Sequence, residues 1–171
     1  HATLERFLSQ GAYKLARYRW IFQQRPPGTT ANNFTNLFDL ATAANATGTS
    51  FVPNLLNLAD IEQWMRCEVF DRAMGNWDAW GFNVGQNMFI YKQPGQKWVL
   101  MPWDIDFTFG RGNGPGDALW GTGNEPVLQR MYDTPAFPRM LWRAYLDIVN
   151  GPYLPQNYSP QLDARRKALV Q

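Results

Sequence analysis

Residues 76–110 read NWDAWGFNVGQNMFIYKQPGQKWVLMPWDIDFTFG, and this stretch decides the fold. Its two apolar runs, residues 88–91 and 98–101, are rich in aromatic and branched side chains, as β-strands are. Between them, Pro94 suits the second position of a type II turn, and Gly95 supplies the positive φ that the third position requires. The stretch therefore predicts an antiparallel β-hairpin, and its first strand is apolar enough to be buried on both faces.

Polar side chains gather at one end of the predicted hairpin. They are Asp78, Asn83 and Asn87 before the first strand, and Asp104 and Asp106 after the second. An antiparallel hairpin brings the start of its first strand beside the end of its second. We therefore expect these five side chains to meet in space.

A cluster of carboxylate and amide oxygens is what a hard divalent cation requires. Magnesium prefers oxygen ligands and commonly shares them with the phosphates of a substrate. The cluster therefore suggests a metal-assisted phosphoryl-transfer site. The alternative is that these residues only form turns and caps, because Asp and Asn are common in turns; this applies most to Asn83. It applies least to Asp104 and Asp106, because two carboxylates directly after an apolar strand would be costly to bury without a partner.

The same residues resemble the CotH kinase family, a group of atypical protein kinases that are secreted or belong to spore coats. The resemblance lies in Asn-Trp-Asp at 76–78, in Gln-Asn-Met-Phe-Ile-Tyr at 86–91, and in the run 98–110 that contains Pro-Trp-Asp-Ile-Asp. It covers residues 55–112 well and extends weakly toward the N-terminus. One departure is visible, because Gln86 stands where the family pattern has histidine. Glutamine still donates a hydrogen bond but does not titrate.

The resemblance implies roles for the residues before the hairpin. In protein kinases an aspartate of the catalytic loop accepts the proton of the substrate hydroxyl, and an asparagine shortly after it binds Mg²⁺. By position, Asp78 corresponds to the catalytic aspartate and Asn87 to the metal-binding asparagine. Asn83 is the alternative for the second role, because it follows Asp78 by five residues, as in ordinary kinases.

The residues after the hairpin complete the implied site. A second aspartate after a hairpin binds the other metal ion in protein kinases, and Asp104, Asp106 or both fill this position. Trp103, directly before them, is assigned to the cofactor-binding residues together with Asn87 and Asn83. The implied cofactors are ATP and either Mg²⁺ or Mn²⁺.

The chain is expected to be a single α+β domain. Its 171 residues are enough for one core. The resemblance implies a protein-kinase-like, mostly helical C-lobe with the β-hairpin carrying the metal site. Residues 1–55 would form the hinge and early lobe, and residues 56–171 the catalytic lobe. No stretch supplies both a phosphate-binding lysine and its glutamate partner, so we expect the N-lobe to lie upstream and to be largely absent from these residues.

Residues 61–74 carry the clearest helix pattern. Asp60 is a good N-cap, Gln63 completes a capping box, and Gly75 ends the helix. The side chains expected to be buried along one stripe are Ile61, Met65, Val69 and Ala73. The hairpin should therefore follow directly on a buried helix.

Weaker periodic patterns flank this central part. Further helices are predicted at residues 33–44, at 125–132, from 135 or 137 to 149, and at 162–170. Near the N-terminus, residues 3–8 suggest a short helix, and residues 12–23 suggest a strand or a strand pair.

Composition excludes several classes of protein. A net charge of +2 is too small to argue for nucleic-acid binding, and no run is long and apolar enough to span a membrane. Cys67 is the only cysteine, so an internal disulfide is impossible, and we interpret it as a small buried residue rather than a nucleophile. His1 is the only histidine, and without it no histidine-based triad or metal site can form.

The resemblance implies a protein substrate with a Ser or Thr acceptor, and an extracellular, cell-surface or spore-coat location. Two alternatives remain. An Asp-x-Asp after an apolar strand also holds the metal of a nucleotide sugar in many glycosyltransferases, but glycosyl transfer gives no reason for the Asn-x-Asp at 76–78. Some relatives act as surface adhesins, and the eight Trp and seven Tyr residues suit binding of sugars or a host protein. Asp78→Ala would then leave binding unchanged.

The 171 residues in isolation are expected to bind ATP poorly or not at all, because they lack the phosphate-binding lysine and glutamate of an N-lobe. Calorimetric titration of this segment with ATP and Mg²⁺ measures the affinity directly. Measurable phosphoryl transfer by these residues alone would contradict the prediction.

Overall fold

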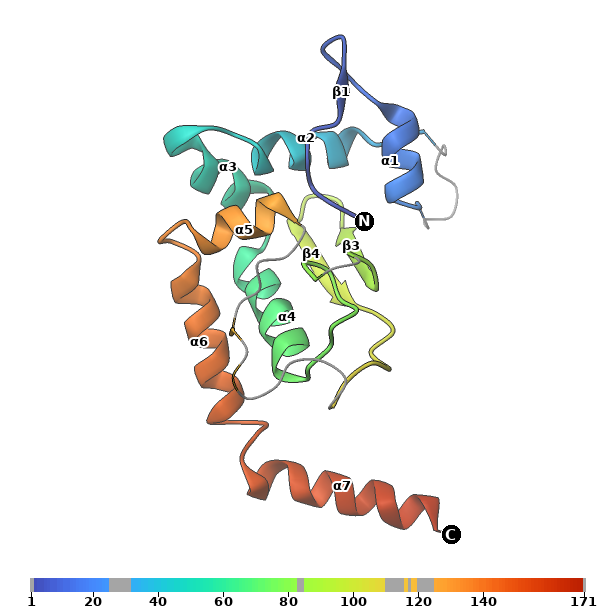
Figure 1. Cartoon of the computed structure of the whole chain (residues 1–171), viewed down its shortest axis with the longest axis vertical. Helices are drawn as coiled ribbons and strands as arrows, with labels where there is room; N and C mark the ends of the chain where they lie inside the picture. The colour runs from blue at the N-terminus through green and yellow to red at the C-terminus, as the bar shows by residue number, and fades with distance from the viewer. Residues whose placement is uncertain are drawn as a thin grey trace.

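Helix α4 (Ile61–Ala73) lies at the centre of the molecule, between the hairpin and helix α6 (Pro138–Val149) (Figure 1). Three apolar side chains on one stripe of α4, those of Ile61, Met65 and Val69, are at most 1% exposed. The predicted helix and its buried stripe are confirmed, although Ala73 at the end of the stripe is only partly buried. The hairpin and α6 are therefore both packed against one buried helix.

The computed structural model describes residues 2–24, 32–82, 85–109, 116, 118–119 and 125–170. Within these residues the fold is α+β, as predicted, with seven α-helices, one short 3-10 helix and two two-stranded sheets. In chain order the elements are β1 (Leu8–Ser9), β2 (Ala12–Tyr13), α1 (Leu15–Ile21), α2 (Thr35–Ala44), η1 (Gly48–Ser50), α3 (Phe51–Leu58), α4, β3 (Met88–Lys92), β4 (Trp98–Pro102), α5 (Pro126–Tyr132), α6 and α7 (Pro155–Leu169). None of these helices is long and apolar enough to cross a membrane.

Both ends of α4 carry the predicted capping residues. The carboxylate of Asp60 accepts a hydrogen bond from the backbone N–H of Gln63 at 3.1 Å, and Gly75 has a φ of 66° just after the helix. The predicted capping box is only half formed, because the Gln63 side chain turns to the hairpin. Its Nε2 donates to the carbonyl of Leu100 at 2.7 Å, and its Oε1 accepts from the N–H of Leu100 at 2.9 Å. One side chain thus joins the helix to the hairpin.

Strands β3 and β4 form the predicted antiparallel hairpin. Their register runs from Met88 opposite Pro102 to Lys92 opposite Trp98. Gly95 has a φ of 74°, as the predicted turn requires. The open end of the hairpin, where the chain enters β3 and leaves β4, therefore lies at Met88 and Pro102.

Only one face of this hairpin is buried. Ile90 and Leu100 lie on the face that packs into the core, and Leu100 is 2% exposed. On the other face, Tyr91 is 50% exposed and Met101 is 43% exposed. The prediction that both faces are buried is wrong, because α4 covers one side of the sheet and apolar composition alone does not report what covers the other side.

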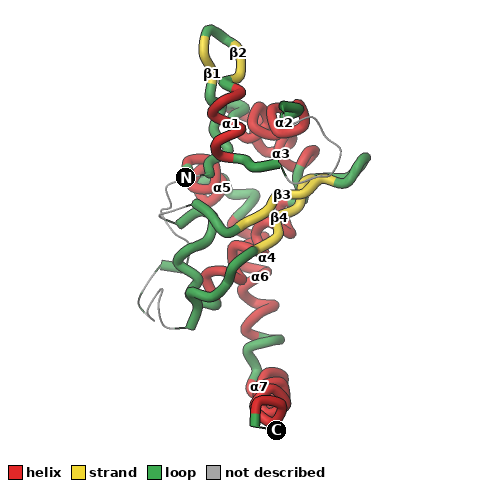
Figure 2. Tube along the Cα trace, turned by 90° about the vertical axis from the view of Figure 1, so that its right-hand side faces the viewer, coloured by secondary structure: helices red, strands yellow, loops and turns green. Residues whose placement is uncertain are grey.

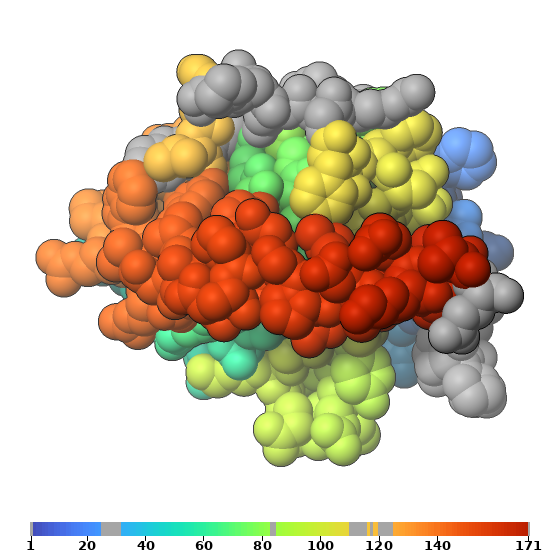
Figure 3. Space-filling view, turned by 90° about the horizontal axis from the view of Figure 1, so that it is seen from below, coloured from blue at the N-terminus to red at the C-terminus, as the bar shows by residue number. Residues whose placement is uncertain are grey.

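The predicted helices on either side of α4 and the hairpin are present as α2, α5, α6 and α7. Helix α7 begins earlier than the sequence pattern indicates, at Pro155, and all of its residues are exposed. Figure 3 shows α7 lying across the lower end of the molecule. It therefore adds length to the molecule without adding to the core.

The N-terminal part differs from the sequence prediction. Residues 3–7 have no regular secondary structure instead of the predicted helix, and β1 and β2 make a short hairpin at the upper end of the molecule (Figure 2). The prediction of a strand or a strand pair at residues 12–23 is correct only for the two residues of β2, and most of the range forms helix α1. Tyr18 in α1 is fully buried, with its ring edge-on to Tyr13 and Phe38 at centroid distances of 5.5 and 5.0 Å. Burial of this aromatic cluster outweighs the strand propensity of the aromatic residues.

The loop after α4 packs closely against α5. Gly81 in this loop has a φ of 85°, and a Cβ atom there would overlap Cδ2 of Leu128. Gly95 also has a positive φ, 74°, but a Cβ atom there would meet nothing within 4 Å. Substitutions at these two glycines therefore distinguish the cost of backbone strain, which both share, from the cost of overpacking, which arises only at Gly81.

Gly81→Ala is expected to lower the free energy of unfolding by about 2–5 kcal/mol, the sum of a left-handed conformation and overpacking against Leu128. Gly95→Ala, with the backbone strain alone, should cost about 1–2 kcal/mol. Urea unfolding of both variants measures the difference. Equal decreases in the free energy of unfolding would show that the Leu128 side chain moves aside without destabilising the protein.

Candidate functional site

The loop of residues 76–82 carries Asp78 from the end of α4 toward the open end of the hairpin (Figure 1). Asp78 is 5% exposed. Nε2 of Gln86 donates to Oδ1 of Asp78 at 2.7 Å and to Oδ2 at 2.9 Å. Nδ2 of Asn87 donates to Oδ2 of Asp78 at 2.7 Å. Asp78 and Asn87, two of the predicted site residues, are thus in direct contact, and two side-chain amides orient the carboxylate.

Asn76 links this carboxylate to α4. It is fully buried, and its Oδ1 accepts a hydrogen bond from the backbone N–H of Asp78 at 3.3 Å. Its Nδ2 donates to Oδ1 of Asp71 at 2.9 Å, and its backbone N–H donates to the carbonyl of Asp71 at 2.8 Å. Asn76 is not among the predicted site residues, although the Asn-x-Asp spacing suits a side-chain hydrogen bond to the backbone N–H two residues on.

The open end of the hairpin brings Asn87 next to Trp103. The backbone N–H of Trp103 donates to the carbonyl of Asn87 at 2.9 Å, one step beyond the last pair of the ladder. Asn87 and Asp104 both have left-handed backbone conformations, with φ of 56° and 54°. Asn and Asp adopt this region at lower cost than other non-glycine residues. The sequence therefore places tolerant residues where the chain turns into and out of the hairpin.

Within the part of the chain that the structure describes, the side-chain contact inside the expected polar cluster is the one between Asp78 and Asn87. Asp104 and Asp106 are exposed, so both carboxylates are hydrated and the free-energy cost of burying them without a partner does not arise. Among the described residues, no group of three or more His, Cys, Asp and Glu side chains is close enough together to hold a metal ion. The reason is that the ladder fixes only residues next to its last pair, and both aspartates lie beyond it. Asn83 lies outside the described residues.

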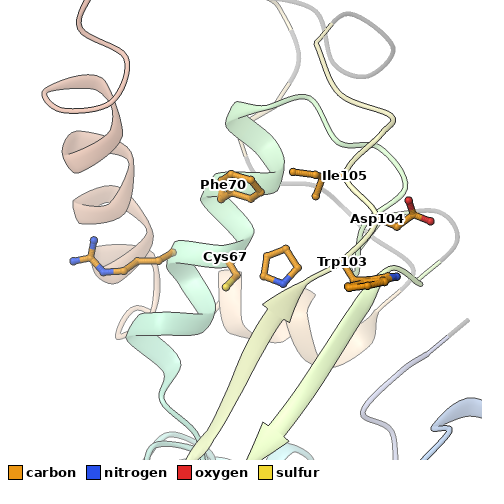
Figure 4. Close-up of a pocket in the computed structure, with 7 residues that line it drawn as sticks. Cys67, Phe70, Trp103, Asp104 and Ile105 are labelled. Carbon is orange, nitrogen blue, oxygen red and sulfur yellow. The ribbon is translucent and has the colours of Figure 1, made fainter. Parts of the chain in front are cut away.

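A hollow of about 540 Å³ lies between α4 and the end of β4. Its lining is mostly apolar and consists of Arg66, Cys67, Phe70, Pro102, Trp103, Asp104 and Ile105. Figure 4 shows the Asp104 carboxylate pointing away from Cys67 and Phe70. Cys67 is only partly buried, and this burial raises the pKa of its thiol to about 11, which argues against a nucleophile.

Two further charged side chains of α4 support the loop of residues 76–82. Glu68 and Arg72 form an ion pair at 2.8 Å, with side chains 2% and 6% exposed. The hydroxyl of Tyr132 donates to Oε1 of Glu68 at 2.5 Å. The guanidinium of Arg72 lies over the ring of Phe82, with Cζ 3.7 Å from the centroid. The loop is therefore held at its start by Asn76 and at its end by Phe82.

Residues 17–171 match the family model described as CotH kinase protein. The chain belongs to the CotH kinase family. This confirms the resemblance seen in the hairpin and its flanking residues. A search of curated proteins found no match.

In this member of the CotH kinase family, burial raises the pKa of two carboxyl groups, those of Asp71 and Glu125. Burial raises the pKa of Asp71 to about 7, against the hydrogen bond from Asn76, which lowers it. Burial likewise raises the pKa of Glu125 to about 7. Glu125 accepts hydrogen bonds from the backbone N–H groups of Leu4 at 2.6 Å and Leu128 at 2.5 Å, and so ties the N-terminal segment to α5.

Glu125→Gln is expected to reduce the loss of stability at high pH. The pKa of Glu125 is raised in the folded state, so the folded protein binds more protons than the unfolded chain between about pH 4.5 and 7. Stability contributed by this group therefore falls as pH rises through that window. From pH 5 to pH 8, the wild type should lose roughly 2–3 kcal/mol relative to Glu125→Gln.

Urea unfolding at both pH values measures this difference between the two proteins. Asp163→Asn, at a carboxylate whose side chain is 64% exposed, is the control and should follow the wild type. A difference between wild type and Glu125→Gln that stays constant across this range would contradict the assignment.

Proposed function

We propose that these residues carry the phosphoryl-transfer centre of an atypical, ATP-dependent protein kinase, with Asp78 as its catalytic aspartate. Membership of the CotH kinase family supports a kinase-like activity. The observation that carries the finer assignment is the buried carboxylate of Asp78, oriented by the amides of Gln86 and Asn87 at the open end of the hairpin. In this role Asp78 accepts the proton of the substrate hydroxyl.

The metal ligands belong to the same proposal. Asn87 donates to Asp78 through Nδ2, so its Oδ1 is the atom suited to a cation. Asp104, Asp106 or both supply a carboxylate from the other side of the hairpin. Mg²⁺ is usually bound by one or two protein carboxylates together with substrate phosphates and water. The donor set therefore fits Mg²⁺ or Mn²⁺ without a preformed cage of three carboxylates. When bound, the ion would neutralise charge on the phosphates.

The nucleotide and the acceptor complete the proposal. The indole of Trp103 is 60% exposed beside Asp104, and we assign it to ATP binding with Asn87, keeping Asn83 as the alternative to Asn87. The acceptor is a Ser or Thr hydroxyl of a secreted or surface protein. Residues 56–171 act as the catalytic lobe, residues 1–55 as the hinge and early lobe, and an upstream N-lobe supplies the phosphate-binding lysine.

One observation favours a binding module instead. Trp103 and Phe109, on either side of the two aspartates, are 60% and 76% exposed. Exposed aromatic rings of this kind suit contact with a sugar or a protein surface. Asp78 distinguishes the two functions, because a binding module does not require its carboxylate.

The proposal is tested by titrating ATP with Mg²⁺ or Mn²⁺ into the full-length protein that contains these residues. Asp104→Ala, Asp106→Ala or both should weaken metal-dependent ATP binding by about tenfold or more, because a cation ligand is lost. Asp78→Asn should leave this binding within about twofold and lower phosphoryl transfer by about 10²- to 10⁴-fold.

Asp163→Ala is the matched control, since it removes an exposed carboxylate from α7, outside the site. Calorimetry measures the binding, and transfer of labelled phosphate to a protein acceptor measures the activity. Absence of metal-dependent ATP binding in the full-length protein would overturn the kinase proposal and favour the binding module.

A further inference from the structure

Asp71 occupies an unfavourable position for a carboxylate. It lies in the last turns of α4 and is 6% exposed. The C-terminal end of a helix carries partial negative charge and disfavours an anion. Burial also disfavours the charged form, which is why the pKa of Asp71 is raised to about 7. An apolar residue would serve the core better at this position, so stability alone does not explain the aspartate.

The hydrogen bonds of Asp71 lead to Asp78 in two steps. Oδ1 of Asp71 accepts from Nδ2 of Asn76 at 2.9 Å, and Oδ1 of Asn76 accepts from the backbone N–H of Asp78 at 3.3 Å. The acceptor on Asp71 fixes which way the Asn76 amide faces. With the amide reversed, its nitrogen would face the Asp78 N–H, and two donors would oppose each other. Asp71 thus sets the orientation of the group that holds the Asp78 backbone.

We propose that Asp71, acting through Asn76, is a positioning residue that fixes the backbone of Asp78 and so aims its carboxylate at the open end of the hairpin. The inference rests on the proposed catalytic role of Asp78. Gln86 and Asn87 hold the carboxylate itself, whereas Asp71 and Asn76 hold the main chain that carries it. Both attachments are needed, because a displacement of about 1 Å at a reacting group lowers rates by about 10²-fold.

Only the acceptor oxygen of Asp71 matters in this role, and its charge does not. Asp71→Asn keeps an oxygen that accepts from Asn76, whereas Asp71→Leu keeps the same branching of heavy atoms in a larger side chain with no acceptor. The two variants therefore separate positioning from packing. Asn76→Ala breaks the same link from within the loop and leaves α4 unchanged.

The test uses the full-length protein and compares kcat and KM for the three variants. Asp71→Leu and Asn76→Ala should lower kcat by about 10- to 100-fold and change KM for ATP by less than about twofold, because both side chains are buried and would act only through Asp78. Asp71→Asn should restore kcat to within about threefold of the wild type. Equal loss in Asp71→Asn and Asp71→Leu, or unchanged kcat in Asn76→Ala, would overturn the inference.

Glu125→Leu provides a matched control. Glu125 is also a buried carboxylate that accepts hydrogen bonds, at 2% exposure, but its bonds are to the N–H groups of Leu4 and Leu128 and so tie the N-terminal segment to α5. Its replacement should lower the midpoint of thermal unfolding and leave kcat unchanged. A loss of kcat as large as that of Asp71→Leu would mean that destabilisation alone explains both results.

Hydrogen exchange separates this inference from the proposed function. The amide of Asp78 should exchange about tenfold faster or more in Asn76→Ala and Asp71→Leu, while the amides of α4 keep their protection. If the wild type transfers no phosphate, the proposed function fails, and this exchange pattern alone decides whether Asp71 positions Asp78. Unchanged exchange at Asp78 would reject the positioning role even where the kinase activity is present.

Discussion

Helix α4 buries three ionisable side chains near its end, and the arrangement of the site depends on how they are satisfied. Glu68 and Arg72 pair with each other, and Asp71 has Asn76 as its partner. Removing one partner of a buried ion pair costs about 3–5 kcal/mol, so these side chains tightly restrict the chain around them. The loop of residues 76–82 supplies Asn76 at its start and the ring of Phe82 at its end. The position of Asp78 follows from this restriction.

The parts of the fold that short-range chemistry controls were predictable from sequence. Turn residues fixed the hairpin, and the cap at Asp60 with the apolar period fixed α4. The contact between the two flanks of the hairpin, in which the backbone N–H of Trp103 donates to the carbonyl of Asn87, was predictable in kind, because antiparallel pairing places these flanks together. Each of these features depends on residues close in sequence or on the geometry of one strand pair.

Features that depend on tertiary burial were not predictable. Helix α1 has aromatic residues that favour a strand, and the buried position of Tyr18 decides the outcome. The exposed face of the hairpin is as apolar as its buried face. The roles of Asn76 and Gln86 require knowing that Asp78 is buried, since only a buried carboxylate needs fixed donors around it. Gln86 in place of the family histidine also makes these donors independent of pH, because an amide keeps both protons at every pH.

The side chain of Gln63 has a consequence for the hairpin as a whole. A sheet of two strands has two edges, and an exposed edge offers backbone donors and acceptors to strands of other molecules. Gln63 occupies both the N–H and the carbonyl of Leu100, and the backbone N–H of Asp60 occupies the carbonyl of Trp98. The start of α4 thus takes the place of a neighbouring strand along β4. The helix that carries the buried charges therefore also prevents strands of other molecules from pairing with this edge of the hairpin.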